Sequence, residues 1–447
     1  MRISAVKYTV LSWVSILIIL IFIIVPYQGF LSVWGASLFG HYTLLRLWDE
    51  ILLAISLVGA LYLILADKKI RFNTLSRHLV WVILAYIFLT LSLGIVSYID
   101  KDVTKKAFLY GLIVNLRYLI FFLVTWCVSL RFSRLRRNWR TLVLWPSVIV
   151  IVFGLLQIFV LPSDFLKHFG YGPHTIPVIE TVNSNTKYIR IASTLRGANP
   201  LGAYLIIPIS LLSILILKTK QSSIRHLALL IGAGVVLFYT YSRSALAGAL
   251  VTLAIVFLSA KLPKKYIKLA YIVVAVLIIA GGIFYAADKN NPVLQNLITH
   301  SQKHSSVKTT SDANHLNGLK NGIKQVLHQP LGMGPGSAGP ASVYNNNKVR
   351  IAENYYVQIG QEVGWLGLIL FILINTGVGY LLWKRREDPL ALALFASLIG
   401  ISLVNMLSHA WSDDTLSYIW WGLAGIAMVP ENTKDKTTHA TSTSTVK

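Results

Sequence analysis

The chain has 447 residues, of which 55% are hydrophobic and 13% are charged, and its mean hydropathy is +0.64. A soluble domain carries about 25% charged residues, so the composition excludes a soluble enzyme and indicates a protein that uses lipid as part of its solvent. The 41 Lys and Arg against 17 Asp and Glu give a formal net charge of +24. The one cysteine, Cys127, lies in an apolar run, which excludes an intramolecular disulfide and a thiolate metal cluster.

Apolar runs of about 17–25 residues, long enough to cross a bilayer as helices, recur along the chain. The first run follows Arg2 and Lys7 and has no convincing small-x-small cleavage site, so we interpret it as an uncleaved anchor. The sequence predicts an all-α, polytopic integral membrane protein with about 12 transmembrane helices. Their predicted ranges are 10–30, 47–66, 79–98, 107–130, 141–161, 199–217, 227–241, 244–260, 267–287, 355–382, 390–408 and 414–429.

Basic residues gather in five loops, each of which follows an even-numbered predicted span. They are Lys68, Lys69, Arg71 and Arg77, then Arg131, Arg134, Arg136, Arg137 and Arg140, then Lys218, Lys220 and Arg225, then Lys261, Lys264, Lys265 and Lys268, then Lys384, Arg385 and Arg386. Because cytoplasmic loops carry the excess of Lys and Arg, we predict that both termini are cytoplasmic. We expect a multi-pass protein of the plasma membrane, the inner membrane where a cell has two. The basic surplus is then a topology signal, so the lipid bilayer is an expected partner and nucleic acid is not.

This topology places two long polar segments outside the cell membrane. The expected organisation is transmembrane helices 1–5 at 1–161, an external loop at 162–198, transmembrane helices 6–9 at 199–287, a large external loop at 288–354, transmembrane helices 10–12 at 355–430 and a disordered cytoplasmic tail at 431–447. The large loop lies between helices 9 and 10. Loops of more than about 15 residues without secondary structure are uncommon unless they are functional, and this loop is longer than that. Apolar residues from Leu316 to Leu327 recur at helical spacing, which predicts a short amphipathic helix on the membrane surface or over a site.

Four motifs lie at the external ends of the predicted spans. They are Arg190, Arg196, Asn199, Pro200 and Gly202 before span six, Ser242-Arg243 between spans seven and eight, the glycine-rich stretch 328–336, and Glu353-Asn354-Tyr355 with Glu362, Gly364 and Gly367 at the start of span ten. In order and spacing these motifs resemble those of the O-antigen ligase and O-antigen polymerase family of bacterial membrane glycosyltransferases. The resemblance covers residues 185–370 approximately, together with the twelve-span plan. Glu353 occupies the position of the ligase histidine, which favours a polymerase-like or other transferase over a strict ligase.

The resemblance implies transfer of a glycan from an undecaprenyl-diphosphate carrier to an acceptor hydroxyl, as in cell-surface polysaccharide biosynthesis. The acceptor would be a saccharide, a glycolipid or a protein. The sequence has no HExxH motif and no convincing paired-carboxylate site for a metal, so we expect no metal and no cofactor. Fixed arginines would then stabilise the leaving diphosphate by charge-assisted, bidentate hydrogen bonds. Arg190 and Arg243 are the expected catalytic cations, and Glu353 is the expected general base. The expected substrate-binding residues are Arg196, Asn199, Asn354, Tyr355 and Arg117.

Structural interpretations of these residues stay open at this point. Arginines near span ends can bind lipid phosphates, Glu353 can serve the helix macrodipole, and Arg117 can pair with Glu362 inside the membrane. Two other classes of protein also remain: a flippase or transporter of lipid-linked glycans, and a non-catalytic envelope-assembly protein. A transporter is expected to place charges deep in its helices and often has internal repeats, whereas polar residues here concentrate in external loops.

Overall fold

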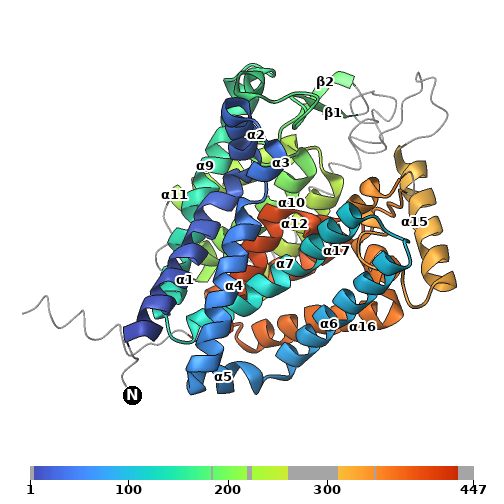
Figure 1. The fold of residues 1–447 in the computed structure, drawn as a ribbon. Helices are drawn as coiled ribbons and strands as arrows, with labels where there is room; N and C mark the ends of the chain where they lie inside the picture. The colour runs from blue at the N-terminus through green and yellow to red at the C-terminus, as the bar shows by residue number, and fades with distance from the viewer. Residues whose placement is uncertain (1–4, 183–184, 219–223, 260–310, 347–348, 431–447) are drawn as a thin grey trace, which may run out of the picture.

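The computed structural model describes residues 5–182, 185–218, 224–259, 311–346 and 349–430. The predicted ninth span at 267–287, residues 288–310 of the large loop and the tail at 431–447 lie outside these residues. The described part is mainly helical (Figure 1). Its principal helices are α1 (Ala5–Ile24), α2 (Gln28–Phe39), α3 (Tyr42–Leu45), α4 (Trp48–Ala66), α5 (Lys68–Leu75), α6 (His78–Ile99), α7 (Lys105–Ser129), α8 (Ser133–Arg137), α9 (Trp139–Phe159), α10 (Ala198–Lys218), α11 (Ile224–Tyr239), α12 (Arg243–Ser259), α15 (Ser311–His328), α16 (Tyr355–Lys384), α17 (Pro389–Asn405) and α18 (Asp414–Ala427).

Seven helical segments in the described residues are long and apolar enough to cross a membrane. They contain α1 with α2, α4, α6, α7, α9, α10 and α16, while α11, α12 and α17 are shorter apolar helices. The predicted class, an all-α polytopic membrane protein, is confirmed by this architecture. The count of twelve spans and the sidedness of the loops stay predictions.

The segment 162–198, which we predict to be an external loop, contains secondary structure of its own. It contains a short antiparallel hairpin of β1 (Glu180–Val182) and β2 (Asn185–Arg190), in which Glu180 faces Arg190. The hairpin lies at the top of Figure 1. It contacts the start of α10, because the Ala198 amide donates to the Glu180 carboxylate at 3.3 Å. We call this end of the helix bundle the hairpin end.

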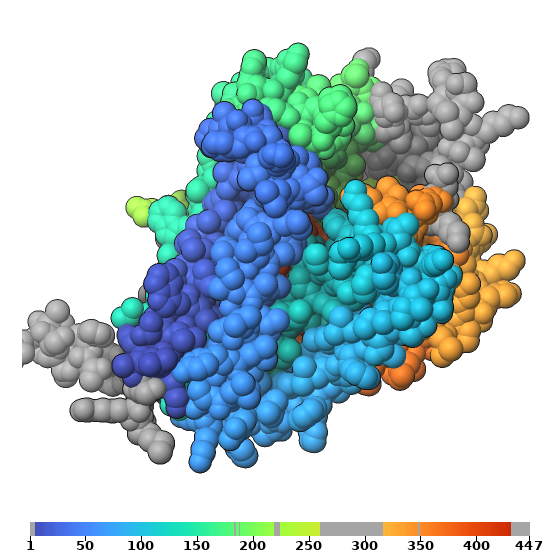
Figure 2. Space-filling view, viewed as in Figure 1, coloured from blue at the N-terminus to red at the C-terminus, as the bar shows by residue number. Residues whose placement is uncertain are grey.

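The C-terminal helices form the centre of the bundle together with α10. Every residue of α18 is buried, and in Figure 2 the red C-terminal helices are visible only between the blue and cyan helices of this face. Small residues allow close helix packing here, as is typical of membrane bundles. A Cβ atom on Gly400 of α17 would lie 2.3 Å from the Gly248 carbonyl oxygen of α12, so the two backbones are in contact.

Basic side chains gather at the end of the bundle opposite the hairpin end. Arg131 pairs with Asp67 at 2.8 Å, Arg136 pairs with Asp388, and the Lys218 ammonium donates to the Arg386 carbonyl at 3.1 Å. Segments that are far apart in the sequence therefore share one basic end, near α5 in Figure 1. This is the distribution that the loop charges predict, although the direction of the bundle in a membrane stays a prediction.

Residues 330–336 of the glycine-rich stretch pack against a break in α16. Gly364 interrupts this helix with φ +69°, and the Trp365 amide donates to the Pro330 carbonyl at 2.9 Å. Two turns into α16, the buried Glu362 carboxylate accepts hydrogen bonds from the Gly336 amide at 2.7 Å and from Asn115 at 2.6 Å. The acidic residue of this motif therefore holds the glycine-rich stretch against α7 and α16.

Replacing Gly364 with alanine is expected to destabilise the protein. A Cβ atom there would lie 2.3 Å from the Pro330 carbonyl oxygen, in a backbone conformation that L side chains rarely adopt, and such strain costs about 1–3 kcal/mol. We expect a lower melting temperature in detergent. Gly234→Ala is the matched control, because Gly234 is helical and has open space around it. Equal melting temperatures of the two variants would contradict the prediction.

Candidate active site

Arg190 is the last residue of β2, and its side chain extends to the start of α10 and to the turn before α12. Its Nε donates to the Thr240 carbonyl oxygen at 2.8 Å, and its Nη2 donates to the Asn199 side chain at 2.5 Å. Glu180 lies 4.0 Å away. Burial lowers the pKa of Arg190, while Glu180 opposes this effect. Arg190 thus connects the hairpin to the start of α10 and to the turn before α12.

Arg243 is the first residue of α12 and is exposed at the hairpin end. Its turn lies against the start of α10, because a Cβ atom on Gly202 would be 2.8 Å from Ala245 Cβ and 3.2 Å from Ser242 Cβ. Since Arg190 binds the Thr240 carbonyl of the same turn, the first two sequence motifs meet at one place. The fold therefore brings Arg190, Asn199 and Arg243 to a common region of the hairpin end.

Glu353 and Asn354 lie at the end of α17, where α16 begins. Asn354 caps α16 by accepting from the Val357 amide at 3.0 Å, and its Nδ2 donates to the Met406 carbonyl at 2.9 Å. Glu353 is half-buried, with φ +51°. The helix α17 runs antiparallel to α12, with Val404 against Gly248. Glu353 and the α12 N-terminus therefore lie at the same end of the bundle, on elements that both pack against α17.

Arg196 lies six residues after Arg190 but points to a different set of partners. Its Nε donates to Asp413 Oδ2 at 3.1 Å, and its Nη2 donates to the Ser412 carbonyl at 3.4 Å. Burial lowers the pKa of Arg196, but the carboxylates of Asp414 and Asp413 outweigh it and the net pKa is raised. Burial raises the pKa of Asp413, which Arg196 partly offsets. Arg196 stays cationic in this environment.

Two of the expected substrate-binding residues are buried and have structural partners. Arg117 is 4% exposed and forms ion pairs with Glu50 at 2.9 Å and with Asp414. Its partner is therefore not Glu362, the alternative that the sequence left open. Tyr355 is fully buried, and its hydroxyl lies 3.1 Å from the Tyr118 hydroxyl. Both side chains organise the helices below the hairpin end.

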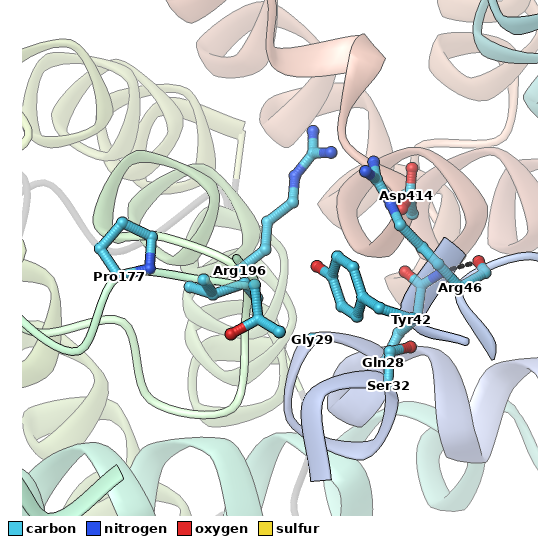
Figure 3. A pocket seen from close by; sticks show the side chains of 10 residues that line it. Gln28, Gly29, Ser32, Tyr42, Arg46, Pro177, Arg196 and Asp414 are labelled. Carbon is cyan, nitrogen blue, oxygen red and sulfur yellow. Dashed lines mark hydrogen bonds between the residues drawn. The ribbon is translucent and has the colours of Figure 1, made fainter. Parts of the chain in front are cut away.

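A polar cavity that the sequence did not reveal lies beside Arg196. The cavity has a volume of about 210 Å³, and Figure 3 shows Arg196 and Arg46 approaching it on either side of Tyr42. Its lining residues are Gln28, Gly29, Ser32, Tyr42, Arg46, Thr175, Ile176, Pro177, Arg196 and Asp414. These residues come from segments far apart in the sequence, and no motif in the sequence marks them as neighbours.

A bundle of apolar helices that carries Arg190, Arg196 and Arg243 at its hairpin end defines a polytopic membrane protein with a polar site at that end. Residues 227–372, about a third of the chain, match the model of a family described as O-antigen ligase. This match confirms the predicted resemblance to the O-antigen ligase family. It includes three of the four motifs, while residues 190–202 precede it. A comparison with curated proteins gives no significant match.

Proposed function

We propose that the protein is a metal-independent membrane glycosyltransferase of the O-antigen ligase and polymerase type. It transfers a glycan from an undecaprenyl-diphosphate carrier to an acceptor hydroxyl. The family match supports the class of enzyme. The observation that carries the proposal for this chain is the placement of Arg190, Arg243 and Glu353 at one end of the bundle, from three separate sequence motifs.

The proposed reaction is a direct displacement at the anomeric carbon of the donor glycan. The acceptor hydroxyl oxygen forms the new bond to this carbon while the bond to the diphosphate oxygen breaks, and the electron pair leaves with the diphosphate. Arg190 and Arg243 stabilise the negative charge that develops on the leaving group. Glu353 accepts the proton of the acceptor hydroxyl and later releases it to water.

The remaining expected site residues have supporting roles in this proposal, some beside the catalytic residues and some farther from them. Asn199 orients Arg190 through the hydrogen bond described above, and Arg196 adds a cation beside Asp413. Asn354 fixes the backbone next to Glu353 by capping α16. Tyr355 and Arg117 act through the helices that they hold together, and we do not assign them direct contact with the glycan.

The proposal includes the sidedness and the location of the site. The basic end of the bundle faces the cytoplasm with both termini, and the hairpin end faces outward from the plasma membrane. The partners are then a lipid-linked saccharide donor and a saccharide, glycolipid or protein acceptor. A flippase is disfavoured because the arginines of the proposed site lie at one end of the bundle, and the deepest cation described above, Arg117, is already paired.

A transfer assay with purified protein in EDTA tests the proposed function. The donor is a short-chain polyprenyl-diphosphate oligosaccharide, supplied alone and then with candidate acceptors, and the readout is released polyprenyl diphosphate. A product ladder without added acceptor identifies a polymerase, and a single addition identifies a ligase. Absence of release with every donor, in folded protein, would favour the flippase or assembly protein.

Replacing Glu353 with glutamine is expected to lower kcat by about 10²–10⁴-fold, the usual contribution of a general base. The KM for the donor should change little, because glutamine has the same shape and keeps a polar side chain. Glu387→Gln is the matched control, since Glu387 is 72% exposed at the basic end of the bundle. Unchanged kcat in Glu353→Gln would remove Glu353 from the mechanism.

A further inference from the structure

The cavity is lined by Arg46 and Arg196 but not by Arg190. The backbone of the segment 190–196 is fixed to α2, because the Phe30 amide donates to the Thr194 carbonyl at 3.1 Å. Arg190 donates to Thr240 and Asn199, whereas Arg196 donates to Asp413. A ligand in the cavity would therefore contact Arg196 rather than Arg190, the expected cation for the leaving diphosphate.

The arginines of the cavity have carboxylate neighbours. Arg46 and Arg196 line the cavity together with Asp414, and Arg196 pairs with Asp413 behind the lining. Asp49 adds a further carboxyl group behind Gln28, which donates to it at 3.0 Å. These carboxyl groups disfavour a multiply charged anion such as a diphosphate, because they already neighbour the arginines.

The polar groups of the cavity suit a neutral, hydroxyl-rich ligand. Arg46 and Arg196 supply planar donors, Asp414 supplies an acceptor, and Tyr42 and Ser32 supply hydroxyl groups that do both. Ile176 and Pro177 add an apolar wall against which C–H groups can pack. A sugar ring combines hydroxyl groups at its edge with apolar C–H faces, so it matches both kinds of surface.

The size of the cavity limits what can bind. Its volume of about 210 Å³ is below the about 300–1,000 Å³ that is typical of sites for drug-sized ligands. Pro177 is exposed and lies beside the cavity (Figure 3). A single ring could therefore enter while the rest of a glycan extends past Pro177 into solvent.

We propose that this cavity binds one sugar ring of a glycan substrate, with Arg46 and Arg196 as its principal hydrogen-bond donors. The inference rests on the proposed function for its biological meaning, because a glycosyltransferase must hold a donor and an acceptor glycan. Either glycan presents the same chemistry to the cavity, and the kinetic experiment below distinguishes them.

Direct sugar binding tests the cavity without any turnover. Saturation-transfer NMR is recorded on the full chain in detergent with free hexoses, N-acetylhexosamines and hexuronates. We expect saturation transfer from the protein to at least one of these sugars. The saturation transfer should be at least tenfold weaker in Pro177→Trp, a substitution that narrows the cavity, and at least tenfold weaker in Arg46→Ala. Pro173→Trp is the matched control: the same substitution in the same loop, at an exposed residue that does not line the cavity.

Several results would overturn the inference. They are the absence of saturation transfer to any sugar, equal transfer in Pro177→Trp and Pro173→Trp, and displacement of the sugar by inorganic diphosphate. If sugars bind as expected but no donor supports release of polyprenyl diphosphate, the cavity assignment stands and the proposed function fails.

Kinetics then identify the glycan that uses the cavity. In an active preparation, Pro177→Trp is expected to raise one KM about tenfold and to leave kcat within a factor of about three. A raised KM for the acceptor assigns the ring to the acceptor glycan, and a raised KM for the donor assigns it to the donor. A fall in kcat with both KM values unchanged would contradict a binding role.

Discussion

Arg243→Ala is expected to lower kcat for glycan transfer by about 10²–10³-fold, the usual effect of removing one fixed donor to a developing negative charge. Arg190→Ala should have a similar effect, because both cations would stabilise the same leaving diphosphate. The measurement is release of polyprenyl diphosphate under saturating donor. Arg243→Lys should recover part of the activity, since it keeps the charge and loses the bidentate geometry.

The double variant separates a shared role from two independent roles. If Arg190 and Arg243 act on one diphosphate, the combined loss should be smaller than the product of the two single losses. Arg386→Ala is the matched control, because Arg386 is an exposed arginine at the opposite end of the bundle. Normal transfer by folded Arg243→Ala would exclude the assignment of Arg243 as a catalytic cation.

Arg117→Met is expected to cause the largest loss of stability. Arg117 is 4% exposed and bridges Glu50 of α4 and Asp414 of α18. The variant therefore leaves the Glu50 carboxylate without this cation and removes one of the arginines beside Asp414. Removing one partner of a buried pair costs about 3–5 kcal/mol. We expect a strongly lowered melting temperature and a lower yield of monodisperse protein in detergent.

A second arginine provides the comparison for this effect. Arg131 pairs with Asp67 at the basic end with side-chain exposures of 22% and 10%, and Arg131→Met should cost less because partly exposed pairs contribute less. Adding Glu50→Gln and Asp414→Asn to Arg117→Met should restore part of the lost stability by removing the uncompensated charges. A melting temperature of Arg117→Met equal to that of Arg131→Met would show that the buried pairs contribute little.

Hydropathy located the helices because a membrane helix must bury or expose a continuous apolar surface along its whole length. The described helices α4, α6, α7, α9 and α10 begin and end within a few residues of the predicted spans. Hydropathy does not determine which helices are neighbours. For that reason the sequence could offer only Glu362 as a partner for Arg117, whereas the fold supplies Glu50 and Asp414.

The motifs predicted which residues matter locally, but not which of them share a cavity. Arg190 and Arg196 are six residues apart in one motif, yet the segment between them directs their side chains to different partners. Arg46 belongs to no motif, and only the fold brings it to the cavity that Asp414 of α18 also lines. Such contacts between distant segments have no signal in a single sequence.

The Ser412 carbonyl oxygen accepts hydrogen bonds from Arg117 at 2.7 Å and from Arg196 at 3.4 Å. The acceptor is a main-chain atom, as is the Thr240 carbonyl that holds Arg190. Main-chain acceptors persist through any substitution that preserves the path of the backbone, so residues 240 and 412 can drift in identity without releasing these arginines. Searches for related proteins that require particular side chains at these two positions would overlook chains that hold their arginines in the same way.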